Sequence, residues 1–176
     1  MDQTKLLKKV AKVLEQLNIP YIVTGGVAVT VWGRPRFTAD IDIAIEISLS
    51  KSKDLLKALQ KIDRKIYISE VAVNQAVMGN GEFNLIHPDG LKVDFWVLKN
   101  DIYARSRIKR RKLKKAWGQN ISFISPDDLI LSKLFGTKKP AQPVSWKISN
   151  QSSRFRKNWT GNTSGAGRKF MRRKNF

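Results

Sequence analysis

Hydrophobic residues recur with helical spacing at the start of the chain and with strand spacing soon afterwards. Within residues 4–17, apolar side chains occupy every third or fourth position and lysines occupy the other face, which predicts an amphipathic helix. Residues 21–24 (YIVT) are predicted to form a short buried strand, and residues 41–47 (IDIAIEI) alternate isoleucine with other residues, as strands do. The apolar run between these strands, 27–32 (VAVTVW), fits either a strand or a short buried helix, because a Gly pair precedes it.

The regular pattern continues to residue 134. Helical spacing predicts helices over residues 50–62 and 69–79. Residues 83–98 predict a β-hairpin, because two strand-like runs flank a Pro-Asp-Gly turn in which proline restricts φ and glycine accepts a positive φ. The remaining expected elements are a basic helix over 101–114, a strand over 121–124 and a helix over 125–134, with Ser125 as its N-cap.

The composition changes sharply after residue 134. The chain of 176 residues carries 34 Lys and Arg against 14 Asp and Glu, a net charge of +20. Residues 135–176 hold 11 of these basic residues, have no Leu, Asp or Glu, and keep no helical or strand period. We therefore expect one domain over 1–134 and a basic, disordered or out-of-frame tail over 135–176. The tail accounts for much of the charge that would otherwise indicate a polyanion partner.

The composition also excludes several classes of protein. There is no cysteine, which excludes disulfides and metal sites with Cys ligands. The N-terminal segment is charged throughout and lacks the apolar core of a signal peptide. No apolar run approaches the roughly 20 residues that span a bilayer. We therefore expect a cytoplasmic protein without a membrane partner.

Two carboxylates on one predicted strand are the first candidate chemistry. Side chains alternate along a strand, so Asp40 and Asp42 would face the same side with their Cα atoms roughly 7 Å apart. Such carboxylates repel each other unless a cation lies between them, and Mg²⁺ prefers hard oxygen ligands of this kind. Asp94 is a lone acid in the apolar segment LKVDFWV, which calls for an explanation. If the two strands are neighbours, the three carboxylates would meet and could hold two metal ions.

Gly25 and Gly26 give this arrangement a second component. Glycine lets a phosphate approach backbone N–H groups closely. A helix that starts just after the glycines would also favour a triphosphate at its N-terminus. A strand, a Gly pair, a short helix and a strand beginning Asp-x-Asp together predict a nucleotide-phosphate site with its metal ligands.

These motifs resemble the nucleotidyltransferase superfamily of the DNA polymerase β type. The shared pattern is a Gly pair, thirteen residues, Asp-Ile-Asp and a later lone Asp in a strand. The string GGVAVTVWGRPRFTADIDI is similar to the small prokaryotic AbiEii-type proteins, which include minimal nucleotidyltransferases and toxin–antitoxin components. The resemblance covers about residues 19–134. It implies an α/β (α+β) nucleotidyltransferase fold, with a small mixed β-sheet and helices mainly on one face.

The resemblance also implies a reaction and a set of site residues. The reaction is Mg²⁺-dependent transfer of a nucleoside monophosphate from an NTP to a hydroxyl, with release of pyrophosphate. The acceptor would be a tRNA end, a partner protein or an antibiotic. The implied catalytic residues, which also bind two Mg²⁺ ions, are Asp40, Asp42 and Asp94. The implied nucleotide-binding residues are Gly25, Gly26, Arg36, Thr38 and Lys133.

The chain departs from the family pattern directly after Lys133. In the family this helix continues with Arg and Asp residues, whereas here the acids and the helical period stop. We interpret the tail as read out of frame, through a frameshift or a sequencing error near residue 135. Two alternatives to an active enzyme therefore stay open. One is a catalytically impaired, antitoxin-like binding partner, and the other is a basic nucleic-acid-binding protein that works through its tail.

Overall fold

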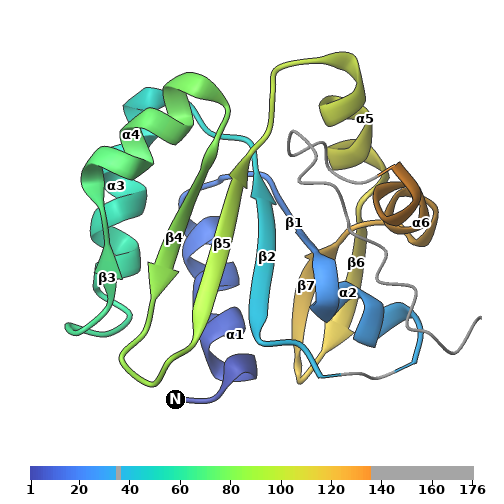
Figure 1. Cartoon of the computed structure of the whole chain (residues 1–176), viewed down its shortest axis with the longest axis horizontal. Coiled ribbons are helices and arrows are strands. Elements are labelled where there is room, and N and C mark those ends of the chain that lie inside the picture. Colours follow the sequence, from blue (N-terminus) through green and yellow to red (C-terminus); the bar gives the residue numbers. More distant parts are fainter. Residues whose placement is uncertain (35–36, 136–176) are drawn as a thin grey trace, which may run out of the picture. The chain divides into compact units, whose positions relative to one another are not determined.

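A seven-stranded mixed sheet forms the centre of this computed structural model, which describes residues 1–34 and 37–135 (Figure 1). The strands are β1 (Tyr21–Thr24), β2 (Asp40–Ile45), β3 (Tyr67–Ile68), β4 (Glu82–Ile86), β5 (Lys92–Val97), β6 (Lys112–Ala116) and β7 (Gln119–Phe123). Their order in the sheet is β3-β4-β5-β2-β1-β7-β6. The pairs β2–β5 and β1–β7 are parallel, and the other pairs are antiparallel. The tail predicted from 135 onwards lies, apart from its first residue, outside the described residues.

Six helices accompany the sheet in the described part of the chain. They are α1 (Gln3–Gln16), α2 (Gly25–Trp32), α3 (Leu49–Gln60), α4 (Glu70–Gly79), α5 (Ile102–Arg110) and α6 (Pro126–Phe135). The ambiguous apolar run 27–32 is therefore helical. None of the helices that the structure describes is long and apolar enough to cross a membrane.

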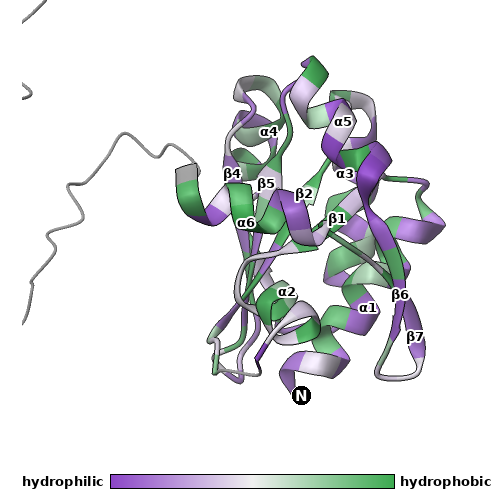
Figure 2. Cartoon of the chain, turned by 90° about the vertical axis from the view of Figure 1, so that its right-hand side faces the viewer, coloured by the Kyte–Doolittle hydropathy of each residue, from purple (hydrophilic) through white to green (hydrophobic). Residues whose placement is uncertain are grey.

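One expected element is wrong. The pattern predicts a single helix over 101–114, but α5 ends at Arg110 and Lys112 begins the edge strand β6, which runs beside β7 (Figure 2). Its pairing with β7 places Ala116 opposite Gln119, so the hairpin turns on Trp117 and Gly118, whose φ angles are 51° and 80°. Two positive φ angles in a two-residue loop are typical of a tight β-hairpin. The turn and its cross-strand partners outweigh the helical propensity of the lysines.

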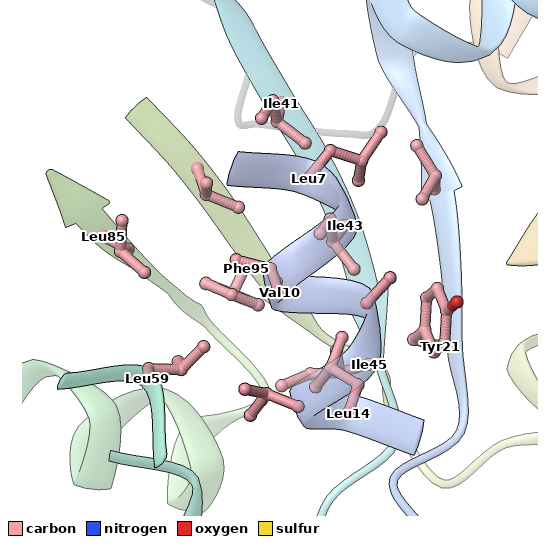
Figure 3. Close-up of a cluster of buried hydrophobic side chains, with 14 of the residues drawn as sticks. Leu7, Val10, Leu14, Tyr21, Ile41, Ile43, Ile45, Leu59, Leu85 and Phe95 are labelled. Carbon is pink, nitrogen blue, oxygen red and sulfur yellow. The ribbon is translucent and has the colours of Figure 1, made fainter. Parts of the chain in front are cut away.

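The main hydrophobic core lies on one face of the sheet. Ile41, Ile43 and Ile45 are alternate residues of β2, are fully buried, and point toward α1 (Figure 3). Buried residues of α3 and α4 join the same cluster. Phe83 and Phe95, on the neighbouring strands β4 and β5, stack with their ring centroids 4.8 Å apart. Each buried side chain of this size contributes about 1.5–3 kcal/mol, so this face anchors the central strands.

The opposite face of the sheet carries α5. Ile22 and Ala44, which alternate with the core residues of β1 and β2, form a second cluster with Ile108 of α5. The predicted mixed α/β fold is confirmed, and α1, α3 and α4 are the helices that cover the main core. The second face is less completely covered, and polar side chains of β2 and β5 occur on it.

Candidate active site

The parallel pairing of β2 with β5 sets the position of the carboxylates. In its register Asp40 lies opposite Lys92, and Asp42 lies opposite Asp94. The intervening residues Ile41 and Val93 are fully buried in the main core. Since side chains alternate along a strand, the four charged residues share the other face. The expected juxtaposition of the two strands is present, whereas the roles of the carboxylates stay predictions.

The surroundings of Asp42 perturb its ionisation. Its side chain is half-buried, and this desolvation raises its pKa above the usual value of 3.8. The negative charges of Asp94 and Asp40 raise the pKa further, while a hydrogen bond from Trp96 and the charge of Lys133 lower it. The net result is a raised pKa. A cation beside Asp42 would relieve this repulsion.

Lys92 already supplies one cation to this group. Its Nζ lies 2.9 Å from Oδ2 of Asp94, and the ion pair raises the pKa of Lys92. The hydrogen-bonding surroundings of Asn84 favour its side-chain amide in the flipped orientation. In that orientation its nitrogen donates to Oδ1 of Asp94 at 2.8 Å. Both carboxylate oxygens of Asp94 therefore have partners within the protein.

This pairing bears on the expected two-metal site. Among the described residues, no three His, Cys, Asp or Glu side chains converge into a group that could hold a metal ion. Asp40 and Asp42 have the hard oxygen donors that suit Mg²⁺. Asp94 fits as a third ligand only if Lys92 releases it. The carboxylates of Asp40 and Asp42 therefore fit a metal ion as they stand. Asp94 could join them only if the metal replaced Lys92 as its partner.

The Gly pair allows a close approach that a side chain would block. Gly25 has φ +62°, and a Cβ atom added there would lie 1.8 Å from Oδ2 of Asp42. A Cβ atom at Gly26 would lie 2.1 Å from Oγ1 of Thr38. The side chain of Thr24 makes no capping hydrogen bond at the start of α2, so it satisfies none of the free N–H groups there. The first turn of α2 therefore lies against the Asp42 carboxylate.

A pocket of about 480 Å³ opens at this position. This volume is within the range of small-molecule sites. The predicted site residues that line it are Gly25, Gly26, Thr38, Asp40, Asp42 and Lys133. Asp94 lies next to Asp42 but is not part of the lining, because it faces Lys92 and Asn84. Arg36 falls outside the described residues.

The far wall of the pocket comes from α5 and α6, which an ion pair joins. Ser125 caps α6 as expected: its Oγ accepts from the backbone N–H of Asp128 at 3.2 Å and donates to the Asp128 carboxylate at 2.8 Å. Arg110 of α5 donates to both oxygens of Asp128, at 2.7 and 3.1 Å, and holds the pKa of Asp128 below its usual value. These contacts fix the position of α6, the helix that carries Lys133.

The sequence analysis did not predict a role for three residues of this region. Tyr103 and Arg107 of α5 line the pocket, and Lys92 neutralises Asp94. Arg107 lay within a basic run that was read only as a whole. Lys92 stands two residues before Asp94, so strand alternation could have placed both on one face.

Comparisons with known proteins identify the fold. No protein-family model matches the chain, and no curated protein is similar enough in sequence to count as a match. A crystal structure of a Thermotoga maritima protein, provisionally assigned as a nucleotidyltransferase, matches with a TM-score of 0.51 and 18% identity, over 75% of this chain and 83% of that one.

Two structures of the antibiotic-resistance factor ANT(2'')-Ia also match. A solution structure gives a TM-score of 0.51 and 19% identity, over 84% of this chain and 79% of that one. A crystal structure with adenylyl-2''-tobramycin gives 0.50 and 17%, over 86% and 84%. The chain therefore has a nucleotidyltransferase-like fold, a mixed α/β arrangement around a seven-stranded sheet.

Proposed function

We propose that this protein is a Mg²⁺-dependent nucleotidyltransferase, which transfers a nucleoside monophosphate from an NTP to a hydroxyl and releases pyrophosphate. The observation that carries the proposal is one pocket in which Asp40 and Asp42 lie beside Gly25 and Gly26. The fold supports it, because one matching ANT(2'')-Ia structure contains an adenylylated antibiotic. Fold alone does not determine function, so the argument rests on the site.

The proposed roles follow from the chemistry of each side chain. Asp40 and Asp42 would hold Mg²⁺, which would polarise the phosphate and favour ionisation of the attacking hydroxyl. The acceptor oxygen forms a bond to the α-phosphorus, and the bond from that phosphorus to the pyrophosphate oxygen breaks. Asp94 would help activate the hydroxyl by accepting its proton, once Lys92 has moved away. Gly25, Gly26, Thr38, Lys133 and Arg36 are proposed to bind the nucleotide.

The acceptor is proposed only as a class. The resemblance to AbiEii-type proteins suggests a role in a toxin–antitoxin or abortive-infection system. A tRNA end or a hydroxyl of a partner protein would then accept the nucleotide. An antibiotic hydroxyl, the kind of acceptor indicated by the ANT(2'')-Ia structure, would serve the same active site.

Thermal unfolding tests the nucleotide site directly. We would melt the protein with and without Mg²⁺ and each NTP, beside the double variant Asp40→Asn/Asp42→Asn. A ligand at about 100 times its Kd should add about 2.7 kcal/mol to the free energy of unfolding. We expect a metal-dependent shift that the double variant loses. A cooperative melt without any shift would contradict an active nucleotide site.

A catalytically impaired binding partner is the second candidate function. The observation that favours it is the Lys92–Asp94 ion pair, which occupies the third carboxylate of the expected site. This candidate predicts that the protein binds a partner without turning over NTP. The nucleic-acid-binding alternative predicts instead that RNA or DNA affinity, with its steep salt dependence, disappears when residues 135–176 are deleted.

The tail beyond α6 is proposed to be out of frame. Translating the other two frames of the gene beyond codon 134 tests this proposal. One of the two frames should restore an amphipathic, acid-containing helix after Lys133. If neither frame does so, the out-of-frame proposal fails.

A further inference from the structure

Arg107 presents an unsatisfied hydrogen-bond donor at the candidate pocket. The residue belongs to the pocket lining, and its Nε is buried without a hydrogen-bond partner in the described part of the chain. A buried polar group without a partner costs free energy. A phosphate in the pocket could supply an acceptor to the guanidinium group, because Arg107 is part of the lining.

Helix α5 holds Arg107 in place. Ala104 and Ile108 are buried against the protein, and Asp101 caps the helix by accepting from the backbone N–H of Ala104 at 2.8 Å. Tyr103 precedes Arg107 by one turn, and the guanidinium carbon lies 5.6 Å from the centroid of its ring. This cation–π contact orients the guanidinium before any ligand binds.

Arg107 is near enough to Asp128 for its charge to help lower the pKa of that acid, but it makes no direct ion pair. Its neighbour Arg110 makes the bidentate contact with Asp128, whereas Arg107 forms no ion pair with any described residue. Lys99 and Lys133 also line the pocket, so the walls from α5, α6 and the end of β5 carry three cations against one acid, Asp101. Asp40 and Asp42 lie on β2. A polyphosphate with a divalent cation at one end matches this separation of charge.

We propose that Arg107 is a phosphate-binding residue and that its guanidinium group donates to an oxygen of the nucleotide's polyphosphate. Tyr103 acts as a positioning residue that fixes the plane of the guanidinium. Arginine suits this task because its planar fork matches phosphate geometry. The identity of the ligand as a nucleotide rests on the proposed function, whereas the phosphate-binding chemistry rests on Arg107 and its surroundings.

Calorimetric titration with inorganic tripolyphosphate tests the inference without requiring catalysis. The full-length chain is titrated at fixed salt and without divalent metal. Arg107→Gln should weaken binding on the order of tenfold, which is the size expected for a lost charge-assisted hydrogen bond. The matched control is Arg105→Gln on the same helix: Arg105 is exposed, donates to Asn100 and does not line the pocket. It removes the same charge and should change the affinity less than twofold.

Three results would overturn the inference. In the first, wild type fails to bind tripolyphosphate. In the second, Arg107→Gln binds it as tightly as Arg105→Gln does. In the third, the variant loses affinity only for a short single-stranded oligonucleotide, which would assign Arg107 to a nucleic-acid acceptor instead.

Two further variants make the outcome independent of folding and of the proposed function. If Arg107→Gln melts at a lower temperature, Arg107→Lys is used, because it keeps the charge and removes the planar fork. Its affinity should lie between those of wild type and Arg107→Gln, and wild-type affinity would count against the inference. The dependence on Arg107 should persist in the Asp40→Asn/Asp42→Asn background. If it persists while no NTP shifts the melt, the proposed function fails and the phosphate-binding residue stands.

Discussion

The pocket has a helical wall (α5 and α6) and a strand wall (β2 and β5), and behind each of them lies a paired carboxylate outside the lining. The two pairs differ in kind. On the helical wall, Asp128 is 1% exposed, its carboxylate accepts from Arg110 and Ser125, and its backbone N–H donates to Ser125. On the strand wall, Asp94 takes a single ion pair from Lys92 and lies in register with a further acid, Asp42.

The Asp128 pair stabilises the fold, whereas the Lys92–Asp94 pair can exchange one cation for another. The Asp128 network satisfies a buried group and joins α5 to α6, and removing one member leaves the others without partners. The Lys92 side chain is 36% exposed, so water can replace its contact with Asp94 at a small cost in free energy. The helical wall should therefore resist change, whereas the strand wall should allow one cation to replace another.

The largest loss of stability is expected at Gly25, where an added side chain has no space beside Asp42. Gly25→Ala should lower the free energy of unfolding by about 3–4 kcal/mol, because it adds left-handed backbone strain to a clash with the Asp42 carboxylate. Gly90→Ala is the matched control, since Gly90 has φ +79° with no atom within 4 Å of the added Cβ. It should cost about 1–2 kcal/mol from strain alone. Equal losses in urea titrations would show that Asp42 moves aside freely.

The helical wall is tested by Asp128→Ala. The variant removes the contacts of Arg110 and the hydrogen bond from Ser125. We expect the free energy of unfolding to fall by about 2–3 kcal/mol. Asp127→Ala is the control, because Asp127 is an exposed acid in the same first turn of α6. If both substitutions cost the same, the Asp128 network is not a structural brace.

The strand wall is tested by Lys92→Met. This change should lower stability by less than about 1 kcal/mol, because the pair is partly exposed. It should also tighten Mn²⁺ binding on the order of tenfold, since Lys92 no longer competes with the metal for Asp94. Titration with Mn²⁺, followed by electron paramagnetic resonance, measures this. Lys99→Met, in the same pocket but without a contact to Asp94, should leave the affinity unchanged.

The smallest effect is a pair of opposite pH dependences. The pKa of Asp42 is raised in the folded state, so its contribution to stability decreases as the pH rises from 3.8 through the raised pKa. The pKa of Asp128 is lowered, so its contribution is lost as the pH falls below 3.8. Melting curves between about pH 3 and 6 should therefore show that Asp42→Asn gains on wild type as the pH rises above 3.8. A constant difference would contradict the raised pKa.

Most of the local structure was accessible from the sequence because its signals are local. The periods of apolar residues predicted most elements, and Ser125 was recognised as a cap from its immediate neighbours. The segment 112–116 was missed because its strand is stabilised by β7 and by the Trp117-Gly118 turn. Lysine-rich sequence alone favours a helix there.

The site divides in the same way. Asp40 and Asp42 share one face by the period of a strand, and the short spacing to Gly25 and Gly26 brings α2 beside them, so the sequence by itself determined this half of the pocket. Tertiary structure alone decided the rest. The β2–β5 register placed Asp94 next to Asp42 and Lys92 opposite Asp40, and helix packing brought Arg107 to the far wall. These contacts join segments about 50 or more residues apart in the sequence, and such pairings depend on how whole elements bury their apolar faces rather than on any local preference.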